Sequence, residues 1–148
     1  MTALTSRILV PVANEEDAPR TCEAIAEHLS DEADTTDVVA FHVIEKAGGA
    51  PDKAPLPARE EQAERIFKIV ESYSQTFGYT VETRLVFGTD VLESILDGAV
   101  EADATSILFV PRPSGRLTRL LTGNLSSQLV SEAPVPVITL PQPSEVDE

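Results

Sequence analysis

Short, almost entirely apolar runs alternate along this chain with longer stretches whose apolar residues recur every three or four positions. Four of the runs are residues 7–12 (RILVPV), 37–44 (DVVAFHVI), 105–110 (TSILFV) and 135–140 (VPVITL). Runs of this length without polar alternation are typical of parallel strands that are covered on both faces. Prolines bracket the last run, and they favour an edge of the sheet, where a missing N–H is tolerated.

A fifth run, residues 79–87 (YTVETRLVF), alternates instead. One side carries Val81, Thr83, Leu85 and Phe87, and the other carries Glu82 and Arg84. Such alternation predicts a half-exposed strand at an edge of the sheet.

The first two helices are predicted from their apolar stripes and end signals. Cys22, Ile25, Ala26 and Leu29 form the first stripe, with Asp17 as the N-cap and Pro19 in the first turn. The second stripe continues to a helix end at Gly78, where a left-handed residue is favoured, and consists of Ala63, Ile66, Phe67, Val70 and Phe77.

Two further helices are predicted in the second half of the chain. Leu92, Ile95, Leu96 and Ala99 form a third stripe, opened by Thr89 or by Asp90, which has Glu93 in the capping-box position. A short helix over residues 124–132 carries Leu125, Leu129 and Val130.

The resulting order of strands and helices is βαβαβαβαβ. Strands separated by helices require parallel pairing and right-handed crossovers, so the chain is predicted to be one α/β domain over residues 1–148 with an open, doubly wound sheet. Residues 48–57 are expected to form a flexible loop or lid, and residues 141–148 a polar tail.

The chain is strongly acidic, with a net charge of -14 over 148 residues, and its only lysines are Lys46, Lys53 and Lys68. An acidic, lysine-poor surface favours solubility at high salt and predicts a halophilic source. It argues against nucleic-acid binding, which needs a basic face. The single cysteine, Cys22, fits a reducing cytoplasm and is expected to be a core residue; we expect no membrane span and no signal peptide.

A carboxylate-free segment is the strongest sign of a binding site. Residues 104–131 hold no Asp or Glu, yet they contain Arg112, Arg116 and Arg119, and they lead to Gly123 at a predicted helix start. Helix N-termini and guanidinium groups favour anions, so a phosphate-sized ligand would fit here. The alternative is that these arginines pair with acids of the same chain or across a dimer interface.

Other candidate residues give weaker signals. His28 is expected to be solvated, and His42 to be a core or strand-end residue rather than a metal ligand. Two histidines and one cysteine far apart do not predict a zinc site. The serines of residues 126–131 lack the GxSxG context of a hydrolase nucleophile, and Glu60, Glu61 and Glu64 indicate a solvated helix face. No catalytic or metal-binding residue is predicted.

Several segments together resemble the universal stress protein family. They are ILVPV, FHVIE, FGTDVLESIL and, from Arg116 onward, RLTRLLTGNLSSQLVSEAPVPVITLP. The resemblance covers nearly the whole chain. It implies a five-stranded sheet of order 3-2-1-4-5 and a homodimer formed through the last strand, here residues 135–140. Many members of the family bind ATP, and others have lost it.

The nucleotide-binding pattern of the family is damaged in this chain. Ala13 replaces the expected aspartate, and the glycine-rich pattern falls on Val110, Pro113, Gly123 and Asn124, so only its third glycine survives. Arg112 and Ser126 match phosphate-facing positions. ATP or another nucleotide thus remains the candidate ligand, with the site assigned to Pro11, Val12, Ala13, Val43, Val110, Arg112, Arg116, Gly123, Asn124, Leu125 and Ser126.

Three functions follow from the resemblance and these departures. The first is a dimeric, non-catalytic stress-response regulator that binds a nucleotide or other phosphate ligand at a degenerate site. The second is a dimeric protein-interaction module that has lost nucleotide binding. The third is a weak ATPase or adenylyl-transfer enzyme, which no acid-base pair in the sequence supports.

Overall fold

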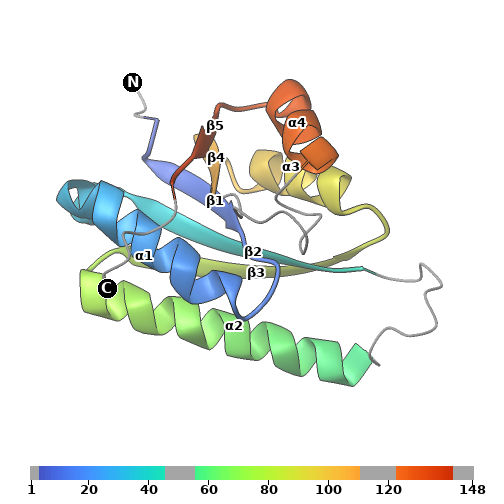
Figure 1. Cartoon of the computed structure of the whole chain (residues 1–148), viewed down its shortest axis with the longest axis horizontal. Helices are drawn as coiled ribbons and strands as arrows, with labels where there is room; N and C mark the ends of the chain where they lie inside the picture. The colour runs from blue at the N-terminus through green and yellow to red at the C-terminus, as the bar shows by residue number, and fades with distance from the viewer. Residues whose placement is uncertain (1–3, 46–55, 111–122, 142–148) are drawn as a thin grey trace.

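The fold is built from five strands and four α-helices that alternate along the chain (Figure 1). The computed structural model describes residues 4–45, 56–110 and 123–141. In chain order the elements are β1 (Arg7–Pro11), α1 (Asp17–Leu29), the 3-10 helix η1 (Ser30–Thr35), β2 (Asp37–Glu45), α2 (Leu56–Phe77), β3 (Thr80–Gly88), α3 (Val91–Glu101), β4 (Ser106–Phe109), α4 (Gly123–Glu132) and β5 (Val137–Thr139). The predicted alternation is confirmed; η1 was not predicted.

All strand pairs are parallel, and the strand order is β3-β2-β1-β4-β5. The open sheet of order 3-2-1-4-5 is therefore confirmed. β1 lies in the middle, between β2 and β4, while β3 and β5 form the two edges, as their sequences predicted.

Each face of the sheet has its own core. On one face α1 and α2 cover β1, β2 and β4, and the central side chains include Ile8, Val10, Val38, Ile66 and Leu108. On the other face α3 and α4 pack on the same strands, with Leu9, Val39, Phe41, Ile107 and Phe109 at the centre. Figure 1 shows the two helical layers on opposite sides of the sheet. Neighbouring residues of one strand thus enter different cores, which explains why these strands lack polar alternation.

Two predicted helix ends are confirmed, and one is corrected. The Asp90 side chain accepts a hydrogen bond from the Glu93 N–H (3.1 Å) and caps α3. Gly78 ends α2 with a φ of 86°, a conformation that glycine adopts without strain. Asp17 is not the cap of α1: it is the first helical residue, and its own N–H donates to the Asn14 side chain (2.9 Å).

Two apolar residues of the predicted helices are exposed rather than buried. Phe77 is exposed and stacks on Tyr73 at the end of α2, and Val130 is exposed on α4. In the same helices, Val70 of α2 and Leu129 of α4 are buried in the cores. Leu56 and Pro57 belong to α2 rather than to the predicted loop, because the helix begins before its apolar stripe does; the rest of that loop lies outside the described residues.

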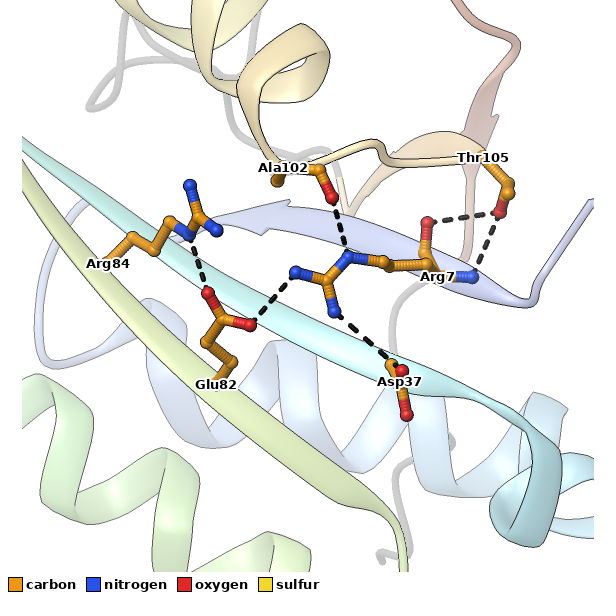
Figure 2. Close-up of polar contacts among 6 residues, drawn as sticks. All are labelled: Arg7, Asp37, Glu82, Arg84, Ala102 and Thr105. Atoms are coloured by element: carbon orange, nitrogen blue, oxygen red, sulfur yellow. Dashed lines mark hydrogen bonds and ion pairs between the residues drawn. The ribbon is translucent and has the colours of Figure 1, made fainter.

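At the amino ends of the strands, Arg7 of β1 contacts α3, β3 and β2, the last through an ion pair between its Nη1 and Asp37 Oδ2 (3.7 Å) (Figure 2). Its Nε donates to the Ala102 carbonyl at the end of α3 (2.6 Å), and its Nη2 donates to Glu82 Oε1 on β3 (2.9 Å). Arg84 donates to the other oxygen of the Glu82 carboxylate (2.6 Å). Hydrogen bonds from Arg7 and Arg84 lower the pKa of Glu82. This cluster closes the amino end of the sheet.

Cys22 is a buried core residue, as predicted. Burial raises the pKa of its thiol to about 11. The nearby Tyr79 hydroxyl opposes this rise in the pKa of Cys22. Its effect is smaller than that of burial, and the hydroxyl forms no hydrogen bond of good geometry with a described residue. Because the thiolate is the reactive form, this cysteine is chemically inert in the folded protein.

We expect Cys22 to react with a thiol reagent such as DTNB only when the chain unfolds. In buffer near neutral pH the folded protein should release no nitrothiobenzoate over minutes, and in denaturant one equivalent per chain. Rapid reaction of the native protein would show that the thiol is accessible and would contradict its place in the core.

Gly98 of α3 lies against the Phe41 ring of β2, and a Cβ at this position would lie 2.5 Å from two ring atoms. We expect Gly98→Ala to lower the free energy of unfolding by about 1–3 kcal/mol, because the helix must move off the sheet. The neighbouring Asp97 is exposed and offers the control, since Asp97→Ala should change stability by less than about 0.5 kcal/mol. Urea unfolding compares them, and equal stability of the two variants would contradict this packing.

Candidate functional site

The switch point of the sheet lies between β1 and β4. On one side of it successive strands are added toward β3, and on the other side they are added toward β5. Beyond it, the Val12 N–H donates to the Phe41 carbonyl (2.9 Å), and the Leu140 N–H donates to the Phe109 carbonyl (3.0 Å). The backbone thus stays hydrogen-bonded up to the carboxyl ends of the strands. We call this end of the sheet, formed by residues 11–15, 42–45 and 110, the carboxyl edge.

Five of the predicted site residues lie at the carboxyl edge within the described part of the chain. Pro11, Val12 and Val110 are buried, while Ala13 and Val43 are half-buried. Val12 and Val110 share the core under α1 and α2, whereas Val43 packs against the core under α3 and α4. The structure therefore gathers these residues at one end of the sheet but on both of its faces.

The remaining predicted residues lie in or before α4. This helix begins at Gly123, so Gly123, Asn124, Leu125 and Ser126 form its first turn. Because α4 connects the parallel strands β4 and β5, it must run back against them, and its N-terminus lies toward the carboxyl edge. Arg112 and Arg116, like Pro113 and Arg119, lie outside the described residues.

Val110 stands at the first glycine position of the nucleotide-binding pattern described above. Its side chain is only 2% exposed and belongs to the core between the sheet and α1 and α2. A glycine in its place would have no side chain, whereas the valine side chain contributes apolar atoms to this core. The departure of the sequence from the nucleotide-binding pattern is thus also a departure in packing.

His42 is a polar residue at the carboxyl edge that was not among the predicted site residues. It was expected to be a core or strand-end histidine, and it is: only 6% of its surface is exposed, and its Nδ1 donates to the Val12 carbonyl (2.7 Å). Burial lowers the pKa of His42, and the bond to Val12 opposes that effect only in part. The ring is therefore neutral near pH 7 and ties β2 to the end of β1.

Two arginines of α2 also hold the carboxyl edge, and no local sequence signal predicted either contact. Arg59 donates to the Glu45 carbonyl at the end of β2 (2.5 Å). Arg65 pairs with Glu15 in the loop after β1 (2.5 Å), with both side chains partly exposed. An exposed pair of this kind contributes little stability, but it orients the loop that precedes α1.

The sequence was compared with models of known protein families. The model of the universal stress protein family matches residues 5–141. This chain belongs to the universal stress protein family. A search of curated proteins with the sequence finds no match.

Solved structures of the family share this fold. The universal stress protein from Archaeoglobus fulgidus in complex with dAMP has a TM-score of 0.65 and 21% identity, over 93% of this chain and 99% of that one. A family protein from Arabidopsis thaliana with AMP bound has a TM-score of 0.66 and 15% identity, over 93% and 92%. One from Burkholderia pseudomallei has a TM-score of 0.70 and 22% identity, over 97% and 100%. At such identities the likeness establishes the fold alone.

None of the helices in the described part of the chain is both long enough and apolar enough to span a bilayer.

We expect His42 to make stability depend on pH. Its pKa in the folded state lies below the ordinary value of 6.5, so the unfolded chain binds a proton first as the pH falls. The free energy of unfolding should therefore decrease as the pH falls from about 7.5 through 6.5, and His42→Gln should remove this part of the slope.

Urea unfolding at several pH values and constant salt measures the slope. His28 is the matched control, because it is exposed on α1 and His28→Gln should leave the slope unchanged. A slope that persists in His42→Gln would show that another group causes it.

Proposed function

We propose that this protein is a non-catalytic, dimeric stress-response regulator that binds a nucleotide or another phosphate ligand at the carboxyl edge. The observation that carries the proposal is the strand order, which places the switch point between β1 and β4 on the side toward which α4 begins. In open parallel sheets, this is where ligands bind.

The charge distribution favours an anion as the ligand. The first turn of a helix presents free backbone N–H groups and the positive end of its dipole. The segment before α4 contributes Arg112 and Arg116 without any Asp or Glu between residues 104 and 131, in a chain whose net charge is -14. Such a reversal of charge in an acidic protein supports a negatively charged ligand.

The solved relatives suggest which anion to test first. The proteins from Archaeoglobus fulgidus and Arabidopsis thaliana hold dAMP and AMP, both adenine nucleotides with one phosphate. Because this chain shares their fold, we propose an adenine nucleotide as the first candidate ligand.

The site is degenerate, and this favours weak or altered binding. Ala13 offers no carboxylate, Pro113 has no N–H to donate, and the Val110 side chain fills part of the core. The buried Val110 also supports the second candidate, an interaction module that has lost its ligand. Neither candidate requires a catalytic residue, and we assign none.

We further propose that the dimer forms through residues 135–140. β5 lies at an edge of the sheet, and among the described residues it pairs only with β4, so its other side is available for a second copy. The proposed compartment is the cytoplasm, and the acidic, lysine-poor surface suits high salt.

Thermal unfolding with and without AMP or ATP plus magnesium, in molar salt, tests ligand binding. A ligand at 100 times its dissociation constant stabilises a protein by about 2.7 kcal/mol, which corresponds to a rise in Tm of roughly 5–10 °C for a chain of this size. We expect a rise that saturates with ligand concentration.

The positive segment is tested by Arg112→Ala with Arg116→Ala, which should abolish the rise in Tm. Lys68→Ala is the control, because it removes a positive charge from the exposed side of α2 and should leave the rise intact. No rise with any nucleotide would favour the interaction module, and an unchanged rise in the double variant would remove the two arginines from the site.

A further inference from the structure

The outer edge of β3 is the side of this strand that faces away from β2. Thr80–Gly88 pairs with β2 through nine consecutive residues without a bulge, and no described residue pairs with its other side. Natural edge strands are usually short, bulged, covered, or protected by charged side chains, especially lysine, or by proline. The charged residues of β3 are Glu82 and Arg84, which bond to each other. This strand is nine residues long and contains neither lysine nor proline. Within the described part of the chain, its outward N–H and C=O groups are therefore available to another strand.

Apolar side chains accompany this free edge on the face that carries α2. Leu85 is 36% exposed and Phe87 is 42% exposed, at positions that the alternating pattern marks as apolar. Val81, nearer the start of the strand, packs against the core beside α1 and α2. Association along the edge would remove part of the exposed apolar surface from water.

Opposite charges alternate on the other face of the same strand. Glu82 and Arg84 are neighbours on this face, and the Arg84 Nε donates to Glu82 Oε2 (2.6 Å). The second oxygen of Glu82 accepts from Arg7 (2.9 Å), which holds the carboxylate in place (Figure 2). Both side chains keep part of their surface exposed, 42% for Glu82 and 33% for Arg84. The edge thus presents one ordered negative and one ordered positive group.

We propose that the outer edge of β3 docks on the same edge of a second copy of this chain, antiparallel and centred on Thr83. In this register Thr83 faces Thr83 of the partner subunit, while Glu82 of each copy faces Arg84 of the other. On the α2 face, Val81 of each copy faces Leu85 of the other. Opposite charges and apolar pairs that face each other directly across antiparallel strands are stabilising.

The charges select this register over its neighbours. In this dimer a two-fold axis runs perpendicular to the sheet, so equivalent side chains of the two copies lie on the same face. The axis must then pass beside one residue of each strand, and the neighbouring registers are centred on Glu82 or on Arg84. Centring on Glu82 places two carboxylates opposite each other, and centring on Arg84 places two guanidinium groups opposite each other. Like charges in directly facing positions are destabilising.

The overall charge sets the salt dependence of the contact. Two copies with a net charge of -14 each repel one another, whereas the backbone bonds and apolar pairs of the edge hardly respond to salt. The screening length falls from about 10 Å at 0.1 M salt to about 3 Å at 1 M. Association through this edge should therefore strengthen as salt rises, even though its exposed ion pairs weaken.

A cysteine placed at the centre of the proposed contact tests it. Thr83→Cys should form a disulfide-linked dimer under mild oxidation, because facing residues have Cβ atoms about 4.5–5.5 Å apart. Leu85→Cys is the matched control on the same face: its two copies would lie about 13 Å apart along the strands. We expect about tenfold more linked dimer for Thr83→Cys, with a larger yield at 1 M than at 0.1 M salt. Cys22 is buried and should not interfere.

Charge exchange in the Thr83→Cys protein gives an independent readout. Glu82→Lys places an ammonium group opposite the guanidinium of Arg84 in the second copy, and Arg84→Glu places two carboxylates opposite each other, so each variant alone should link poorly. Mixed together, the two variants restore opposite charges, and the dimer that forms should contain one chain of each by mass. Equal linking of Thr83→Cys and Leu85→Cys, or no gain on mixing, would overturn the proposal.

Discussion

Everything in this fold depends on the burial of β1 and its neighbours from both sides. Residues 8 and 10 of β1 enter the core under α1 and α2, while residue 9 enters the core under α3 and α4. A parallel strand that is apolar on both faces must have helices on both faces, and parallel pairing forces each connecting helix to run back along the sheet. These constraints bring the starts of the helices to the carboxyl edge, and the strand order leaves β3 and β5 at the two edges of the sheet.

The two ends of the sheet are built differently. At the amino end, Arg7 of β1 donates hydrogen bonds from its guanidinium group to Glu82 of β3 and to the Ala102 carbonyl at the end of α3. At the carboxyl edge the ties are a neutral histidine, His42, and the arginines of α2, while Val12 and Val110 fill the core. The amino end therefore joins the elements to one another. At the carboxyl edge, α4 begins near the switch point. The proposed ligand site belongs to the second end.

The order and type of the elements could be predicted because local pattern and long-range packing agree: the strands were seen as apolar runs, and Asp90 and Gly78 ended their helices as expected. Predictions of helix ends and of burial failed where they depended on side chains or surroundings outside the local pattern. Asn14 rather than Asp17 bonds the start of α1, and Phe77 and Val130 continue apolar stripes onto exposed positions. The partners of His42, Arg59 and Arg65 lie on other elements, so spacing along the chain could not reveal them. Of the site, sequence placed Val12 and Val110 at one end of the sheet, but it could not show that both are packed into the core.

Titration of isotope-labelled protein with AMP, followed by amide NMR shifts, tests most directly whether the carboxyl edge is a binding site. The account predicts saturable shifts of the Val12, Ala13, Val43 and Gly123 amides, with little change at Arg7 and Thr105 at the opposite end. Shifts confined to the amino end, or none at millimolar nucleotide in molar salt, would contradict the placement of a ligand at the carboxyl edge.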